Sequence, residues 1–381
     1  MSVLYAQTRF LSRTADDLYC KSLISVHYPE SSCYDCEGGM NMKEKFSILC
    51  TVLVLGLVLP VLGAFLAGNR METPQSPTET TAISEAGTEA AEPEKLTEKT
   101  MEKITVPAVS VLNDDGTVSS MKMSDYLTGV LLAEMPTEFE PEALKAQAVV
   151  SATYALRREE VQDKHGGAVC LHSGCCQGYR DPEEFVRNGG SQADVEKIRN
   201  AVEAVTGQVL TYDGDLIEAT FFSCTGGSTE ATVEVWGGEV PYLQAMPSPG
   251  EEIAAHYKDE QIFSREELEE KLEISLGEDP AGWFDQMRFT EGGGVRSAEV
   301  GGEEFTGVEL RKKLGLRSTD FSVTPMDDQV CLTTHGFGHR VGMSQYGAQA
   351  MALAGNNYVQ ILTHYYQGAE VTQIDKDGQI G

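Results

Sequence analysis

An uncharged and almost entirely apolar run, residues 46–68, constrains this chain more than any other feature of its sequence. Its 23 residues are enough for a helix to span a bilayer with some tilt. Lys43 and Lys45 precede the run, and this basic flank predicts that the N-terminus lies inside the cell and that everything after residue 70 lies outside. We therefore expect 42–70 to be a single-pass anchor in the cell membrane; the alternative is a buried core helix.

The segments on either side of this expected anchor have different compositions. Residues 1–41 resemble neither a targeting signal nor a domain, and we interpret them as a cytoplasmic extension or as the product of a misassigned start upstream of Met42. Residues 71–103 contain eight Glu, seven Thr, three Pro and no aromatic residue. Such a segment cannot bury enough apolar surface to fold, so we expect a disordered acidic linker. Residues 104–375 then form one extracytoplasmic domain.

The charge and hydrophobic content of the whole chain limit its function classes. A net charge of −30 disfavours a nucleic-acid partner, because phosphates would be repelled. A hydrophobic content of 41% is ample for a packed core. Helical and β-like runs do not alternate regularly, so we expect an α+β domain, with room for two lobes around a cleft. The expected helices are 124–134, 141–157, 264–274, 344–354 and 358–367, and the expected strands are 105–111, 208–212, 217–223, 295–300 and 329–334.

The helix expected at 124–134 carries a carboxylate on its apolar face. Leu127, Val130 and Leu131 lie at i, i+3 and i+4, and Glu134 occupies the i+7 position of that face. A carboxyl group directed into packed apolar surface has a raised pKa, because burial penalises its charged form. Such a group suits a general acid that works near neutral pH. The alternative is a structural role, in which Glu134 pairs with a basic residue such as Lys145.

Two more segments carry polar residues that could line a site. In the alanine-rich helix at 141–157 these residues are Lys145, Gln147 and Tyr154, although each could equally cap, pair or pack. The second segment is THGFGHRVGMSQYGAQAMA, whose glycines allow the backbone to approach a ligand closely. Its hydrogen-bonding side chains suit sugar hydroxyls and acetamides, and the alternative is a tight structural turn. These side chains are His339, Ser344, Gln345 and Tyr346.

A short segment rich in His and Cys, KHGGAVCLHSGCCQGY, is a candidate metal site. His165, Cys170 and Cys176 have the spacing H-x4-C-x5-C, with His172 and Cys175 between them. Imidazole and thiolate are the ligands that tetrahedral Zn²⁺ prefers, and the two glycines would let the backbone wrap around an ion. These three close ligands have no obvious fourth in the sequence. The alternative is a disulfide in an oxidising exterior.

Several segments occur together in one order and carry a resemblance to a known family. They are YLTGVLLAEMP, ALKAQAVVSATYALR, FFSCTGGSTE followed by VWGGEVPYLQ, TGVELRKKLGLRS and GFGHRVGMSQYGAQAMA. Over about 250 residues, from near Met123 to near Val371, the chain resembles the family of stage II sporulation protein D and the amidase enhancer. Each motif alone is weak evidence, and their shared order is what makes the resemblance specific.

The resemblance implies a lytic transglycosylase that cleaves peptidoglycan glycan strands stripped of stem peptides by an amidase, during engulfment in sporulation. The family's catalytic acid falls on Glu134, which would protonate the glycosidic oxygen. The same carboxylate, now a base, would help the sugar's C6 hydroxyl close onto C1, leaving a 1,6-anhydro-N-acetylmuramic acid end. Ser223, in the FFSCTGGSTE motif, joins the expected substrate-binding residues. The implied location is the space between mother cell and forespore.

The resemblance also implies a metal and protein partners. Some family members bind zinc through one His and two Cys, which match His165, Cys170 and Cys176, so we expect a structural Zn²⁺. The implied partners are glycan strands, an amidase (stage II sporulation protein P) and stage II sporulation protein M. Arg340 stands where many members have Gly. An arginine of the family's second motif is replaced here by alanine, so that contact is either missing or supplied by Arg157.

Two other functions stay open. The chain could be a binding module that recruits or activates an N-acetylmuramoyl-L-alanine amidase without cutting glycan itself. It could instead be a two-carboxylate glycoside hydrolase, in which case Glu138 or Glu140 would be the second carboxylate.

Overall fold

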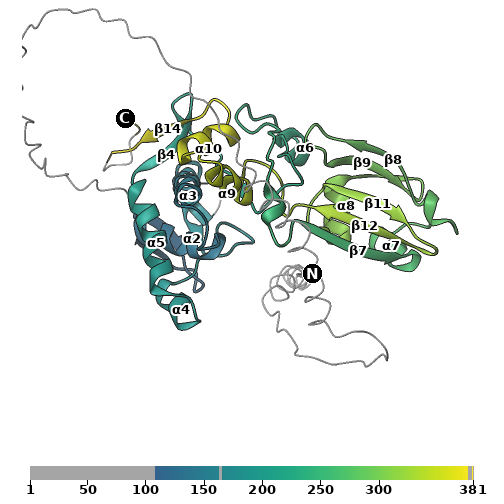
Figure 1. Ribbon diagram of the computed structural model, residues 1–381, viewed down its shortest axis with the longest axis horizontal. Coiled ribbons are helices and arrows are strands. Elements are labelled where there is room, and N and C mark those ends of the chain that lie inside the picture. Colours follow the sequence, from purple (N-terminus) through teal and green to yellow (C-terminus); the bar gives the residue numbers. More distant parts are fainter. Residues whose placement is uncertain (1–107, 163–164, 376–379, 381) are drawn as a thin grey trace, which may run out of the picture. The chain divides into compact units, whose positions relative to one another are not determined.

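The computed structural model describes residues 108–162, 165–375 and 380 (Figure 1). The chain divides into two compact units, 1–100 and 101–381, and every described residue belongs to the second. The described part mixes helices and strands, which confirms the predicted α+β class. Its buried apolar residues form two clusters, each with its own set of elements.

The first cluster is built around helix α3 (Pro141–Val161), which contacts α2, α5, α9 and α10 (Figure 1). The buried residues of α3 are mostly Ala and Val, and these small side chains let the neighbouring helices approach closely. Two three-stranded sheets, in the orders β2-β1-β3 and β14-β4-β5, flank these helices. The helices are α2 (Met123–Glu134), α4 (Pro182–Arg187), α5 (Gln192–Ala204), α9 (Gln345–Leu353) and α10 (Tyr358–Tyr365). The strands are β1 (Ala108–Leu112), β2 (Val118–Lys122), β3 (Val169–Cys170), β4 (Gln208–Tyr212), β5 (Asp215–Leu216) and β14 (Glu370–Gln373).

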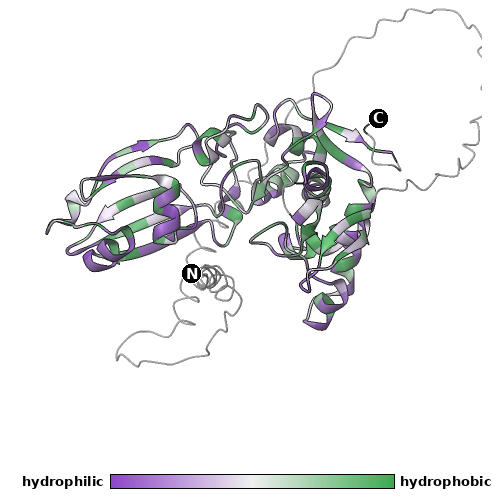
Figure 2. Ribbon diagram, turned by 180° about the vertical axis from the view of Figure 1, so that it is seen from behind, coloured by the Kyte–Doolittle hydropathy of each residue, from purple (hydrophilic) through white to green (hydrophobic). Residues whose placement is uncertain are grey.

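The second cluster lies between two antiparallel sheets, β10-β9-β8 and β11-β12-β7, and the helices α7 and α8. Buried and more exposed residues alternate along β12, and Figure 2 shows such hydropathy changes along the strands of this part. Capping boxes open α7 at Ser264 and α8 at Thr306. The elements are β7 (Lys258–Ser264), α7 (Arg265–Leu272), β8 (Phe284–Phe289), β9 (Val295–Val300), β10 (Glu303–Thr306), α8 (Gly307–Leu314), β11 (Phe321–Pro325) and β12 (Gln329–His335).

Short elements connect the two clusters in sequence. Strand β6 (Phe221–Phe222) pairs in parallel with β13 (Met343–Ser344), which joins two segments more than 100 residues apart. Helix α6 (Thr232–Trp236) and the 3₁₀ turn η2 (Glu251–Ile253) lie on the chain between β6 and β7. The remaining 3₁₀ turns are η1 (His165–Gly167) and η3 (Pro280–Gly282).

The five predicted helices are confirmed within a few residues as α2, α3, α7, α9 and α10. The strands predicted at 208–212, 295–300 and 329–334 are confirmed as β4, β9 and β12, and the described part of 105–111 lies in β1. The strand predicted at 217–223 is wrong except at β6. Ile217 and Ala219 make this run apolar because they fill the first core cluster, whereas their backbone belongs to no sheet. The prediction missed α5, α8 and most strands of the second cluster.

The predicted membrane location is corrected by the structure. No helix among residues 108–162 and 165–375 is long and apolar enough to cross a membrane. The longest, α3, has 21 residues but carries charges along its length. The apolar run 46–68, on which the anchor at 42–70 depended, lies outside the described residues, as do the segments 1–41 and 71–103. Membrane anchoring is therefore not a property that the described structure shows.

A fully buried ion pair ties the second cluster to the segment before β13. Arg340 is 0% exposed and lies 3.2 Å from the carboxylate of Glu230, which is 1% exposed. Arg340 also donates to the carbonyls of Ser228 and Gly292. Its φ is +65°, the left-handed conformation in which glycine is most common, so this turn keeps the backbone geometry that a glycine would allow.

We expect Glu230→Ala to lower the free energy of unfolding by about 3–5 kcal/mol, because it leaves the buried Arg340 charge without its main partner. Denaturant unfolding measures this loss. The control is Glu234→Ala, which breaks the more exposed ion pair with Arg296 and should cost about 0–1 kcal/mol. Equal losses in the two variants would contradict the structural role given to the buried pair.

Candidate active site

One open pocket collects residues from seven separate places along the chain. It is lined by Glu134 at the end of α2 and Tyr154 of α3, and by the segments 173–176, 220–223 and 337–339. Trp236 and Gln345 complete the lining. The pocket encloses about 1050 Å³ of empty space, which is enough to hold a saccharide unit. Among the described residues that line it, Glu134 is the only carboxylate.

Glu134 is the last residue of α2, because the chain turns extended at Met135 and continues into Pro136. Its half-buried carboxylate accepts a hydrogen bond of 2.6 Å from the backbone N–H of Gly178. Burial raises the pKa of Glu134, and the bond from Gly178 opposes this shift only in part. A Cβ at residue 178 would lie 2.8 Å from Oε1 of Glu134, so glycine is what lets the two segments meet this closely.

Lys145, predicted to bind substrate or to pair with Glu134, lies outside the pocket lining and pairs with a different glutamate. Its ammonium group lies 2.6 Å from the carboxylate of Glu142, and it is absent from the lining of the pocket. Glu142 accepts a second bond from the backbone N–H of Tyr358, so the ion pair holds α3 to the start of α10. The interpretation of Lys145 as a pocket residue is corrected by this pairing.

Gln147 and Ser344 also lie outside the pocket lining, and both side chains are fully buried. Gln147 donates to Ser151 one turn later on α3. Ser344 caps α9 and donates to the carboxylate of Glu251 at 2.8 Å. This carboxylate also accepts from the backbone and hydroxyl of Thr225, so Ser344 holds the loops behind the pocket together.

Three of the remaining predicted binding residues line the pocket: Ser223, His339 and Gln345. The ring of His339 lies between those of Phe222 and Trp236, and burial lowers its pKa to about 4, so it is neutral at pH 7. The Nε2 of Gln345 is buried and has no hydrogen-bond partner among the described residues. A buried, unpaired amide donor at a pocket wall is costly unless a ligand accepts its bond.

Tyr346, the last predicted binding residue, lies behind the pocket lining, where its ring makes edge contacts with Phe139 and His256. Its backbone N–H donates to the carbonyl of Ser223. Arg157, expected to replace a missing family arginine, pairs with Glu160 and Glu218 and does not line the pocket. The structure therefore brings neither side chain to the pocket wall.

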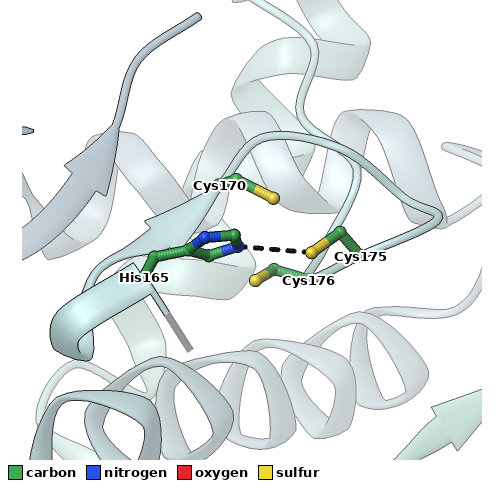
Figure 3. A group of neighbouring side chains, drawn as sticks. All are labelled: His165, Cys170, Cys175 and Cys176. Carbon is green, nitrogen blue, oxygen red and sulfur yellow. Dashed lines mark hydrogen bonds between the residues drawn. The ribbon is translucent and has the colours of Figure 1, made fainter. Parts of the chain in front are cut away.

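Beside the pocket, four potential ligand atoms from His165, Cys170, Cys175 and Cys176 all lie within 4.8 Å of one another. Figure 3 shows the four side chains pointing toward a common centre, with Nε2 of the histidine 3.3 Å from the sulfur of Cys175. One imidazole and three thiols fit the tetrahedral preference of a soft divalent ion, so this cluster could hold a metal.

The cluster adds a fourth candidate ligand to the three predicted from spacing. Cys175 supplies it, whereas His172 points away and its Nε2 contacts Asp114 at 3.1 Å. No disulfide links any two of the five cysteines in the described part of the chain. Burial and the neighbouring thiols raise the pKa of Cys175, and a bound cation would reverse this shift.

The segment that carries the four potential metal ligands, residues 165–176, is followed by residues that contact α2 and Glu134. Cys176 is followed by Gln177, which is fully buried and accepts a hydrogen bond from the hydroxyl of Tyr126 on α2. Gly178 comes next and donates to Glu134. The conformation of residues 165–178 therefore determines where the carboxylate lies.

Sequence reasoning missed Trp236, His256 and Gly178 as site residues, and it gave Cys175 no role as a ligand. Trp236 is 53% exposed and lines the pocket, and His256 contacts Ser223. The sequence held one usable signal, since VWGGEVPYLQ was already part of the family resemblance. His256 stands in a segment without any motif, and only the fold brings it to the site.

Comparisons with known proteins identify the family of the chain. A family model described as "Stage II sporulation protein" matches residues 113–212. The chain is 34% identical over 342 residues to stage II sporulation protein D of Bacillus amyloliquefaciens, covering 88% of this chain and 97% of that protein. The chain belongs to the stage II sporulation protein D family. The family's Bacillus subtilis (strain 168) member is 33% identical over 339 residues, covering 86% of this chain and 95% of that protein.

The comparisons also find a relative with a different name. The amidase enhancer of Bacillus subtilis (strain 168) is 30% identical over 310 residues, covering 65% of this chain and 40% of that protein. The resemblance stated from the sequence motifs is thereby confirmed at the level of the family, and membership assigns the chain to sporulation.

We expect Glu134→Gln to raise the melting temperature at pH 7. The pKa of Glu134 is raised in the folded state, so its charged form lowers the free energy of unfolding at pH values above the usual pKa of 4.5. At lower pH the group is protonated in both the folded and the unfolded state, and this loss of stability disappears. Glutamine keeps an oxygen that can accept the bond from Gly178. Thermal unfolding of both proteins at pH 7 and pH 4 measures the difference, which should shrink at pH 4. A difference that is the same at both pH values would contradict the raised pKa.

Proposed function

We propose that this protein is a lytic transglycosylase that cleaves peptidoglycan glycan strands, preferring strands from which an amidase has removed the stem peptides. The observation that carries the proposal is the Glu134 carboxyl group, whose pKa is raised by burial while it lines an open pocket. A raised pKa favours the protonated carboxyl group, which is the form that donates a proton to a glycosidic oxygen.

In the proposed reaction Glu134 donates its proton to the glycosidic oxygen after N-acetylmuramic acid, while positive charge develops at C1. The C6 hydroxyl of the same sugar then attacks C1 and loses its proton, which yields a 1,6-anhydro end without added water. This route needs no second carboxylate. Glu138 and Glu140 are exposed and absent from the pocket lining, which favours transglycosylation over a two-carboxylate hydrolase.

The pocket walls suit an N-acetylated sugar. Trp236 offers an exposed aromatic face beside His339, and sugar rings pack their C–H groups against such faces. The unpaired Nε2 of Gln345 is a donor for an acetamide carbonyl. An aromatic surface and an amide donor beside one acid group support a glycan substrate.

The His165, Cys170, Cys175 and Cys176 cluster is proposed to hold Zn²⁺ with a structural role. Three thiolates and an imidazole would fill a tetrahedral shell, which leaves no open position for a catalytic water. When bound, the ion would fix the segment 165–178, whose last residue donates to Glu134. The chemistry itself stays with the carboxyl group.

A second candidate function is an amidase-recruiting module, which the likeness to an amidase enhancer favours. An amidase that removes stem peptides would supply the denuded strands that the pocket is proposed to cut. The proposed partners are such an amidase, stage II sporulation protein P, together with stage II sporulation protein M. Both functions are compatible with one protein that works beside the amidase.

The product of digestion tests the proposed activity. We expect the wild-type protein to release 1,6-anhydro ends from amidase-treated glycan, and Glu134→Gln to lose about 10²–10⁴-fold in rate. Mass spectrometry identifies the ends, and Glu140→Gln, an exposed glutamate six residues away, is the control that should retain activity. Reducing ends would indicate a hydrolase, absence of cleavage by the wild type would favour the amidase-recruiting module, and unimpaired cleavage by Glu134→Gln would refute the site.

Tryptophan fluorescence tests the proposed sugar surface. The chain has two tryptophans, and Trp283 is buried at 2% exposure in the second cluster, so a response to an N-acetylglucosamine oligomer should come from Trp236. We expect Trp236→Ala to weaken binding about tenfold, measured by calorimetry. The control is Phe289→Ala, an exposed aromatic outside the pocket. An unchanged affinity in Trp236→Ala would remove this residue from the site.

Elemental analysis tests the metal. Protein purified without added zinc should contain about one Zn²⁺ per chain, and Cys175→Ser should lose it more readily to a chelator because one thiolate is gone. The control is Cys331→Ser, a cysteine on β12 outside the cluster. A zinc-free wild type, or equal retention in the two variants, would contradict the assignment.

A further inference from the structure

Tyr154 forms part of the wall of the pocket that Glu134 also lines. It lies on α3, and two of the four potential metal ligands, Cys175 and Cys176, line the same pocket. The side chain of Tyr154 is half-buried, so it packs against the first cluster while part of it stays accessible. One tyrosine therefore borders both the open pocket and the candidate metal site.

The hydroxyl of Tyr154 bonds to one of these cysteines. A hydrogen bond joins it to the sulfur of Cys176, which belongs to the group of side chains drawn in Figure 3. A phenol keeps its proton at pH 7, and an O–H group is a stronger donor than an S–H group. Tyr154 therefore donates to the sulfur, and the lone pairs of its oxygen can accept from a donor in the pocket.

Arg158, one turn later on α3, makes a second contact with Tyr154. Its guanidinium carbon lies 5.1 Å from the centre of the tyrosine ring, which is a cation–π distance. Arg158 is buried and pairs with the carboxylate of Glu218, which stands just before the wall segment 220–223. The ring is thereby connected to two segments of the pocket wall before any ligand arrives, which lowers the ordering cost of binding.

A wall that binds a glycan needs acceptors as well as donors, because each sugar hydroxyl can donate one hydrogen bond and accept others. The unpaired Nε2 of Gln345 is a donor, and the proton of Glu134 is proposed to go to the glycosidic oxygen. The oxygen of Tyr154 adds an acceptor to the lining of the same pocket. This combination of groups suits a ligand that is rich in hydroxyls.

We propose that the hydroxyl of Tyr154 accepts a hydrogen bond from a sugar hydroxyl of the glycan, and that its bond to Cys176 makes glycan affinity depend on occupancy of the metal site. This inference rests on the proposed function and leaves both proton transfers to Glu134. In the loaded site the sulfur of Cys176 is held by its bond to the ion, so the Tyr154 hydroxyl has a fixed acceptor. In the empty site the cysteine side chain can turn to other rotamers, and the hydroxyl loses the partner that orients it.

Sugar binding to the full-length Glu134→Gln protein tests the binding role, because this variant leaves the oligomer intact. We expect Tyr154→Phe, added to Glu134→Gln, to weaken binding of an N-acetylglucosamine oligomer about tenfold, since phenylalanine keeps the ring and removes the acceptor. Calorimetry measures the affinity of both zinc-loaded proteins. The control is Tyr358→Phe in the same background, a half-buried tyrosine outside the pocket lining, which should bind as its parent does. Equal affinity in Tyr154→Phe and its parent would overturn the inference.

Removal of the metal tests the coupling. After treatment with a chelator, we expect the Glu134→Gln protein to bind the oligomer about tenfold more weakly, and the variant that also carries Tyr154→Phe to lose less than about twofold. Added Zn²⁺ should restore the affinity of the first protein. Equal losses in the two metal-free proteins would overturn the coupling, because the metal would then act without the tyrosine hydroxyl.

The binding measurements are independent of cleavage, so the two proposals can fail separately. A wild-type protein that binds the oligomer but forms no anhydro ends would overturn the proposed reaction, while the binding role of Tyr154 stands. Anhydro ends from a wild-type protein whose affinity is unchanged by Tyr154→Phe would overturn the inference alone. A protein that binds no oligomer would overturn the inference together with the proposed sugar surface.

Discussion

The hydrogen bond from the backbone of Gly178 to the carboxylate of Glu134 is the contact on which the rest of the site depends. It joins the end of α2 to the segment that carries the four potential metal ligands. Glycine is required at this point, because a Cβ would meet the carboxylate oxygen at 2.8 Å. This bond holds the half-buried carboxyl group of Glu134 at the pocket, and burial at the same place raises its pKa.

The opposite wall of the pocket is fixed by buried charges rather than by apolar packing alone. Glu251 accepts hydrogen bonds from Thr225, Ser248 and Ser344, and so connects the segments on either side of the parallel pair β6 and β13. The Arg340–Glu230 pair does the same for the loop that carries His339. Buried polar groups that are bonded across several segments favour one arrangement of loops, which a site built on loops needs.

The sequence was sufficient to predict elements with strong periodicity and the acid on the face of α2, because both depend on neighbours within a few residues. It could not predict partners that the fold brings from far away. Ser344 was predicted to bind a ligand, but in the structure it is buried, caps α9 and donates to Glu251, which lies 93 residues earlier in the sequence. Lys145 was predicted to line the pocket, but it pairs with Glu142, three residues earlier on the same helix. His256 gave no local signal, and the motif that contains Trp236 did not mark that residue as part of the site, since both residues reach the site only where the loops meet.

The proposed reaction depends on a raised pKa of the Glu134 carboxyl group. A carbon-13 NMR titration of protein labelled at the glutamate side-chain carboxyl, with Glu134→Gln used to identify the signal, measures the pKa of Glu134 directly. The account predicts a midpoint above the usual 4.5, with the resonance missing from the variant. A midpoint at or below 4.5 would mean that burial does not favour the protonated form of the group, and it would contradict Glu134 as the proton donor.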